Sequence, residues 1–426
     1  MSCAGIRAYQ IVIALFASAL PSAAQEFIER LDDFLAISAF HGDVRARLSG
    51  SMDLEGYFIQ QPAPGLLFTD RRTLLNPRLT LFLDAQIGAH LYAFAQMRVD
   101  RGFDPERRDG ADVRLDEFAL RISPWEDGRF SVQVGKFGTV VGNWVERHDS
   151  WENPFITAPL PYENTTGIWD IAAPGTSQVL LDWAHIPFRE GQPGDFGAST
   201  DGYSDKYLRA PVIWGPSYAS GISVAGRIGE FDYAAEVKNA SLSSRPESWD
   251  INETGLDHPT FSGRLGFRPN EMWHFGVSAS GGAYMLPEAE SSLPRGRDLG
   301  DYKQLILAQD ISFAWHHLQI WAEFYEARFE VPLIGDADTF AYYVEAKYKF
   351  TPQFSGALRW NQQVFGTIPY DGYDAKWGND ICRIDAAVTY RFTEHMQLKL
   401  QYSVQNEDNA PHEFAHNFAA QFTVRF

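Results

Sequence analysis

The chain has 426 residues, of which 36 are Lys or Arg and 55 are Asp or Glu, so its formal net charge is −19. This acidic balance excludes a nucleic-acid-binding protein, which needs a basic surface. Hydrophobic residues make up 45% of the chain, but no internal apolar run reaches the roughly 20 residues that a membrane-spanning helix requires. If the chain lies in a membrane, it must do so as a closed β-barrel.

Residues 1–24 predict a signal peptide. Arg7 precedes an apolar core, Ile11–Leu20, and small residues at 22–24 offer a cleavage site before Gln25. We therefore expect export to the bacterial outer membrane. Cleavage would leave Cys382 as the only cysteine, which excludes an intrachain disulfide and a cysteine-based metal cluster.

Residues 25–42 follow as a short segment that we expect to lie in the periplasm. Phe27, Leu31 and Phe34 recur at helical spacing within Glu26–Phe40, which predicts a short amphipathic helix.

Residues 43–426 predict an all-β fold, a transmembrane antiparallel β-barrel, because apolar and polar side chains alternate along one segment after another. Val44, Ala46 and Leu48 share one face of the first segment, and Arg45 and Arg47 share the other. The alternation predicts five strands before it stops.

A long interruption then spans residues 142–217 and is rich in Pro, Gly, Trp and Asn. A loop of this length inside a compact domain is usually functional. Counting strands makes it the third loop on the outer side of the barrel. Within it, Gln178–His185 predicts an extra strand or helix.

Alternation then resumes and continues to the C-terminal segment, in which Phe418, Phe422 and Phe426 share a face. The whole pattern predicts about 16 strands, with short turns on one side and long loops on the other, as in bacterial outer-membrane barrels. A barrel of roughly this size encloses an aqueous channel. Aromatic residues beside the turns predict a membrane-interface girdle: Trp273, Trp315, Tyr348, Phe350, Tyr390 and Phe392.

The alternation also assigns many charged residues to the lumen. The predicted pore-lining residues are Arg45, Arg47, Arg78, Arg98, Arg121, Arg227, Arg264, Arg359, Arg383, Asp84, Asp100, Glu236 and Glu345. The same parity places Lys347, Lys349, Arg391 and Lys399 there. An excess of Arg in a pore favours anions. Alternatively, these residues pair with Asp and Glu across strands and stiffen the wall.

The aromatic residues of the third loop allow two interpretations. Trp144, Trp151, Tyr162, Trp169, Trp183, Tyr207 and Trp214 could guide sugars by stacking, or they could pack the loop against the barrel wall. The groupings His148-Asp149 and His316-His317, each of which contains a histidine, complete no recognisable metal site. We therefore expect no metal, no cofactor and no catalytic residues.

Three phrases, residues 130–137, residues 227–233 and the terminal strand, are similar to those of 16-stranded bacterial porins. The chain most resembles the phosphate-selective (O/P-type) porins, although no lysine-rich stretch matches the one that these proteins use near the channel mouth. The resemblance implies a third loop that narrows the lumen, a homotrimer and an outer-membrane location.

The sequence therefore predicts a passive channel for small hydrophilic solutes, with an anion preference that includes phosphate or other anionic nutrients. A channel for sugars or other neutral nutrients is the alternative within this class. An export channel for an acidic polysaccharide and a barrel enzyme are the alternatives from other classes.

Overall fold

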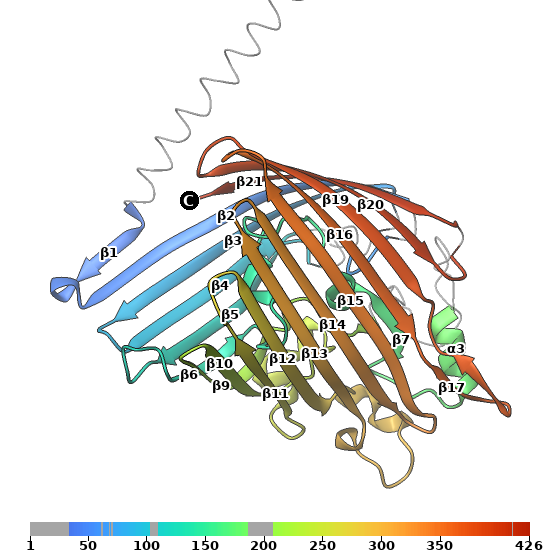
Figure 1. The fold of residues 1–426 in the computed structure, drawn as a ribbon. Helices are drawn as coiled ribbons and strands as arrows, with labels where there is room; N and C mark the ends of the chain where they lie inside the picture. The colour runs from blue at the N-terminus through green and yellow to red at the C-terminus, as the bar shows by residue number, and fades with distance from the viewer. Residues whose placement is uncertain are drawn as a thin grey trace, which may run out of the picture.

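A computed structural model describes residues 34–60, 63–67, 69, 71–102, 110–185, 208–410 and 412–426. In it, 16 antiparallel strands form a closed barrel (Figure 1). The strands are β2 (Val44–Ile59), β3 (Thr73–Ile87), β4 (Leu91–Asp100), β5 (Asp112–Ile122), β6 (Ser131–Phe137), β9 (Ala219–Ile228), β10 (Phe231–Lys238), β11 (Thr260–Phe267), β12 (Trp273–Ala283), β13 (Lys303–Trp315), β14 (Leu318–Val331), β15 (Gly335–Lys349), β16 (Phe354–Phe365), β19 (Ile381–Arg391), β20 (Met396–Glu407) and β21 (Ala415–Arg425).

Strand β2 closes the barrel because it pairs with β3 on one edge and with the last strand, β21, on the other. The backbones of Gly50 and Phe426 exchange two hydrogen bonds of 2.8 and 2.9 Å at the end of this seam. No edge of the ring is then left to face lipid with unpaired backbone groups. The predicted barrel of 16 strands is confirmed.

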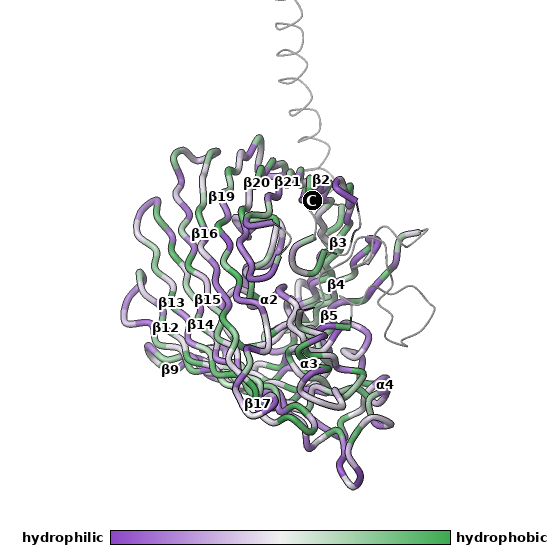
Figure 2. Tube along the Cα trace, turned by 90° about the vertical axis from the view of Figure 1, so that its right-hand side faces the viewer, coloured by the Kyte–Doolittle hydropathy of each residue, from purple (hydrophilic) through white to green (hydrophobic). Residues whose placement is uncertain are grey.

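Side chains alternate between the two faces of each strand, and Figure 2 shows the resulting mixture of hydrophobic and hydrophilic positions along the strands. In β2, Met52, Leu54 and Phe58 are exposed on the outside, whereas Asp53 and Glu55 are buried inside. This pattern places an apolar outer surface against lipid and a polar inner surface against the lumen.

The connections differ at the two ends of the barrel. At one end, which we call the turn end, residues 88–90 join β3 to β4 and residues 229–230 join β9 to β10. Gly88 and Gly229 have φ of 62° and 61°, a conformation that glycine adopts without strain. At the other, loop end, the connections are longer, but residues 332–334 join β14 to β15 as a tight turn. The expectation of a long loop at every such position is therefore wrong there.

An additional strand, β1 (Ala36–Ala39), pairs with residues 44–47 of β2 at the turn end and projects from the ring (Figure 1). The 3-10 turn η1 (Phe40–Gly42) joins the two strands. The prediction of a helix through Phe40 is thus wrong for these residues, because β1 covers the part of the β2 edge that β21 does not reach. The predicted signal peptide, residues 1–24, lies outside the described residues.

Several short elements lie in the loops. The third loop, which we define as residues 138–218, contains η2 (Val145–Arg147), α2 (Leu160–Glu163), β7 (Thr165–Trp169), α3 (Ser177–His185) and β8 (Arg209–Pro211). The other loops contain η4 (Pro246–Ser248), α4 (Ile251–Thr254), η5 (Pro287–Ser292), η6 (Leu299–Asp301) and the hairpin β17 (Thr367–Tyr370) and β18 (Tyr373–Lys376). No helix among the described residues has the length and apolar character needed to cross a membrane.

Candidate functional site

The third loop crosses the lumen and is held against β14 by one carboxylate. Glu323 is fully buried and accepts hydrogen bonds from the backbone N–H groups of Asn143 and Trp144, the latter at 2.9 Å. The hydroxyls of Tyr162 and Tyr325 donate to the same carboxylate at 2.8 and 2.9 Å. Without the carboxylate, both backbone N–H groups and at least one hydroxyl would lose their acceptor, because the two hydroxyls, 2.6 Å apart, can satisfy only one donor between them. Glu323 therefore fixes the path of the loop.

Two ion pairs join the loop to more distant strands. Arg147 of the loop pairs with Glu345 on β15, and Glu163 of the loop pairs with Arg383 on β19. All four side chains are almost completely shielded from water. On the wall side each pair continues into a second one, because Arg383 also pairs with Asp385 and Glu345 also pairs with Arg359. Removal of one partner from such a buried network is destabilising.

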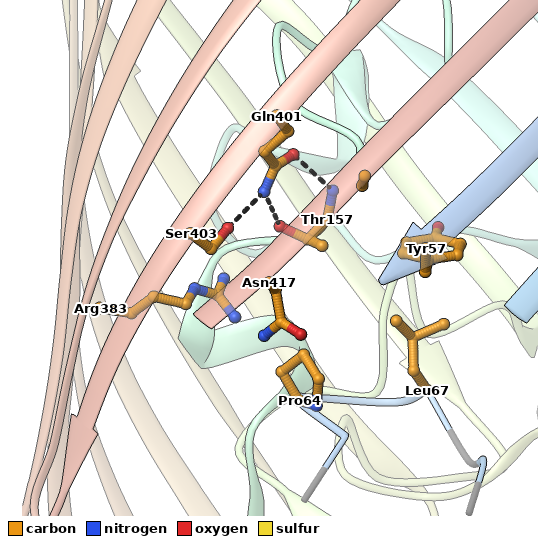
Figure 3. Close-up of a pocket in the computed structure, with 9 residues that line it drawn as sticks. Tyr57, Pro64, Leu67, Thr157, Arg383, Gln401, Ser403 and Asn417 are labelled. Atoms are coloured by element: carbon orange, nitrogen blue, oxygen red, sulfur yellow. Dashed lines mark hydrogen bonds between the residues drawn. The ribbon is translucent and has the colours of Figure 1, made fainter. Parts of the chain in front are cut away.

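The tip of the loop is bound to β20. The side chain of Gln401 accepts a hydrogen bond from the backbone N–H of Thr157 at 3.3 Å and donates to its hydroxyl at 2.8 Å (Figure 3). Lys399, two residues away, donates to the carbonyl oxygen of Ser150 at 2.5 Å. Residues 143–163 of the loop are therefore anchored at several points across the lumen.

The second half of the loop packs at the loop end of the barrel. Helix α3 and strand β7 lie on a hydrophobic cluster that includes the stacked rings of Trp169 and Trp183, whose centroids are 4.5 Å apart. Other members come from three further loops or strand ends: Tyr284, Phe329 and Trp377. The described part of the third loop thus enters the lumen and also covers part of its mouth. Its aromatic residues follow the packing interpretation.

On the opposite side of the loop, a cavity of about 200 Å³ remains between the loop and β2–β5. We call it the chamber. Arg78, Arg98 and Arg114 line it from three neighbouring strands, and each side chain keeps 20 to 22% of its surface exposed. Their carboxylate partners, Asp53, Glu55, Asp100 and Asp116, are only 1 to 7% exposed, although the last three also line the chamber. The guanidinium groups are therefore the more exposed charged groups of this wall.

The loop side of the chamber contains one buried histidine. His148 Nδ1 donates to the carbonyl oxygen of Val145 at 2.6 Å, and its Nε2 accepts from the hydroxyl of Tyr218 at 2.5 Å. Burial lowers the pKa of His148, because the charged imidazolium would lose its hydration. Nearby Arg98 lowers this pKa further, whereas Asp149 and the Val145 hydrogen bond act in the opposite direction.

A second, smaller cavity of about 20 Å³ lies between the loop tip and the turn end of β15, β16, β19 and β20. We call it the basic cavity. Lys347, Lys349, Arg391 and Lys399 line it together with hydroxyl and amide groups, and no Asp or Glu is among its described lining residues. None of these four cations forms an ion pair with a described carboxylate. The arrangement differs from the chamber, where each arginine has an acidic partner.

The predicted pore-lining residues fall into three groups. Arg78, Arg98 and Asp100 line the chamber. Near the turn end, five others lie on the inner face: Arg45, Arg47, Arg121, Arg227 and Asp84. The remaining five are buried against the third loop or against wall carboxylates, so they present little surface to the lumen: Arg264, Arg359, Arg383, Glu236 and Glu345.

Sequence reasoning missed Arg114 and Asp116 of the chamber. Strict alternation counted back from Phe118 puts both on the outside of β5. The pairing of β5 with β4 shifts by one residue, since Gln96 faces Glu117 whereas Met97 faces Leu115. This bulge turns Asp116 and Arg114 inward, and a run of alternating residues carries no signal for it.

The described residues contain no group of three or more His, Cys, Asp or Glu side chains that could hold a metal ion.

No family model matches the sequence, and no curated protein matches it either. Solved structures do match the fold. OmpF of Salmonella typhi, solved in complex with daunomycin, is 13% identical, covering 92% of this chain and 100% of that one with a TM-score of 0.54. The anion-selective porin from Comamonas acidovorans is 12% identical over 90% and 100%, with a TM-score of 0.53.

The outer-membrane protein OmpT of Vibrio cholerae, in a trimer form, is 11% identical over 90% of this chain and 100% of that one, with a TM-score of 0.52. Identities this low establish the fold alone. The closed ring of 16 strands, its polar lumen and these similarities together show that the chain has the fold of bacterial outer-membrane porins.

Proposed function

We propose that this chain is an outer-membrane channel through which small hydrophilic solutes diffuse passively, with a preference for anions. The fold supports the channel, because a barrel of about 16 strands encloses a lumen too wide for side chains alone to fill. Residues 1–24 would direct its export as a cleaved signal peptide. The third loop across the lumen argues against an exporter of polysaccharide, which needs an unobstructed path.

The basic cavity is the observation that carries the anion preference. Lys347, Lys349, Arg391 and Lys399 line one cavity without a carboxylate among the described residues. Fixed cations in a narrow, low-dielectric passage attract anions and repel cations. Phosphate and other small anionic nutrients are the solutes that this charge would favour.

The reversal potential of the purified protein in a planar bilayer under a KCl gradient tests the proposal. We expect a potential displaced toward that of chloride. Displacement toward the potassium potential would contradict the anion preference. The absence of any conductance would contradict the channel itself and favour an enzyme on the same barrel.

We further propose that the channel is a homotrimer that associates through β2–β5. The outer faces of β10–β21 carry many exposed aromatic residues, such as Trp273, Trp315 and Tyr390. On β2–β5 the exposed outer residues are aliphatic apart from Phe58 and Phe118. Aromatic girdles mark the lipid-exposed perimeter of a barrel, so the aliphatic sector is the part that neighbouring copies would cover.

Light scattering of the detergent-solubilised protein tests this assembly. The wild type should be a trimer, and Leu83→Arg on the aliphatic sector should shift it to the monomer. Leu265→Arg, an equally apolar and exposed position on β11, should leave the trimer intact. A monomeric wild type, or equal effects of the two substitutions, would contradict the assignment.

A further inference from the structure

The chamber contains polar atoms that the protein itself does not satisfy. The buried side chains of Asn76, Trp144 and Gln421 line it, and within the described residues Asn76 Oδ1, Trp144 Nε1 and Gln421 Oε1 have no hydrogen-bond partner. The amide nitrogen of Gln421 donates to Glu55 at 2.8 Å, which fixes the orientation of this amide. Each unsatisfied buried group costs about 1–3 kcal/mol. The residues that line the chamber therefore include two acceptors and one donor that lack a partner in the described part of the chain.

Formal charge alone does not make the chamber an anion site. Its lining carries three guanidinium groups and four carboxylates, which leaves one negative charge: Arg78, Arg98, Arg114, Glu55, Asp100, Asp116 and Glu163. A simple anion would gain little there by Coulomb attraction. Directed N–H groups do remain, since the one ion pair that Arg98 forms with a described residue joins its Nε to Asp116 at 3.1 Å, while its side chain is 20% exposed.

Apolar side chains complete the chamber. Leu66, Leu67 and Ile156 line it beside the indole of Trp144. Its volume of about 200 Å³ is below the roughly 300–1,000 Å³ of pockets for drug-sized ligands, so it admits a solute of about one ring.

We propose that the chamber is a binding station for a sugar acid, a single pyranose ring that bears hydroxyls and one carboxylate. The carboxylate would accept from Arg98 and its neighbours in the arginine row. Ring hydroxyls, which both donate and accept, would satisfy Asn76, Gln421 and Trp144. The apolar face of the ring would lie on Leu67 and Ile156. This inference rests on the proposed function, because a solute reaches the chamber only through an open lumen.

Interruption of the chloride current by added solutes in a planar bilayer tests the proposal. Three probes distinguish the contribution of the sugar ring from that of the carboxylate. Glucuronate has both the ring and the carboxylate, glucose lacks the carboxylate, and acetate lacks the ring. We expect glucuronate to interrupt the current at a concentration about tenfold lower than either of the others, a difference of about 1.4 kcal/mol. Equal potency of glucuronate and acetate, or of glucuronate and glucose, would overturn the proposal.

Substitutions inside and outside the chamber test whether the solute binds there. Arg98→Gln should reduce the potency of glucuronate to that of glucose, whereas Arg121→Gln, on the same wall but outside the chamber, should leave it unchanged. Trp144→Phe retains the ring and removes only the N–H donor, so it should weaken glucuronate and glucose alike. Equal losses in the Arg98 and Arg121 variants would place binding elsewhere.

Failure of this inference is distinguishable from failure of the proposed function. A channel that conducts with an anion preference, but does not distinguish the three probes, would retain the proposed function and lose only the chamber assignment.

Discussion

At the scale of single residues, Glu323 has the largest role in placing the third loop. It accepts from two backbone N–H groups and one tyrosine hydroxyl of the distant third loop, and from the hydroxyl of Tyr325 on its own strand. Such a contact cannot be read from local alternation. Sequence parity places Glu323 on the inner face, but it gives no sign that a loop about 180 residues earlier supplies its partners.

Replacement of this carboxylate should loosen the loop. In Glu323→Gln an amide NH₂ group, which donates, replaces one carboxylate oxygen, which accepts. Because the surrounding groups all donate, at least one N–H or O–H is left unsatisfied at a cost of about 1–3 kcal/mol. We expect a noisier open-channel current than in the wild type. Glu326→Gln, on the outer face of the same strand, is the control. Identical noise in both variants would exclude Glu323 as the anchor.

His148 makes the loop sensitive to pH. Its pKa is lowered in the folded protein, so the folded state binds fewer protons than the unfolded state, and stability decreases as the pH falls below the ordinary value of about 6.5. A proton on Nε2 also removes the acceptor of the Tyr218 hydroxyl. The fluctuations of the open-channel current should increase as the pH is lowered from 7.5 to 5.

His148→Gln should lose most of this pH response, because its amide does not titrate. His317→Gln, at an exposed turn, is the matched control and should respond to acid as the wild type does. An undiminished acid response in the His148 variant would assign the effect to another group.

At the scale of elements, the seam between β2 and β21 depends on a close approach. A Cβ at Gly50 would lie 2.7 Å from the ring of Phe426 and 2.9 Å from the carbonyl oxygen of Thr80, whereas one at Gly56 would have no neighbour within 4 Å. Gly50→Ala should therefore destabilise the barrel by about 1–3 kcal/mol through overpacking. Gly56→Ala should leave its stability nearly unchanged.

The temperature at which the folded band disappears on unboiled gels measures this difference. A lower temperature for Gly50→Ala than for Gly56→Ala is expected. Equal temperatures would show that the terminal residue does not close the seam.

The strands were predictable because each repeats the same two-residue period, as in Met52, Asp53, Leu54 and Glu55 of β2. The elements that the sequence misplaced break this period. Strand β1 forms because an edge of β2 is left uncovered. The inward rotation of Asp116 comes from a single bulge. Neither has a local sequence signal.

At the scale of the whole molecule, the two cavities of the lumen differ in the charge of their lining residues. The basic cavity gathers Lys347, Lys349, Arg391 and Lys399 from three strands, β15, β19 and β20, so no lysine-rich stretch marks it in the sequence. The inner arginines behave differently, since most of them are paired with acids across the wall. The excess of inward Arg therefore does not mark the place where the described structure leaves cations without a carboxylate partner.

The permeability ratio of chloride to potassium in a double variant, Lys347→Gln with Lys349→Gln, tests this account most directly. The matched control is Lys303→Gln with Lys376→Gln, two lysines near the loop end outside both cavities. We expect the wild type and the control to favour chloride and the double variant to shift clearly toward potassium. An unchanged ratio in the double variant, or an equal shift in the control, would contradict the assignment of anion preference to the basic cavity.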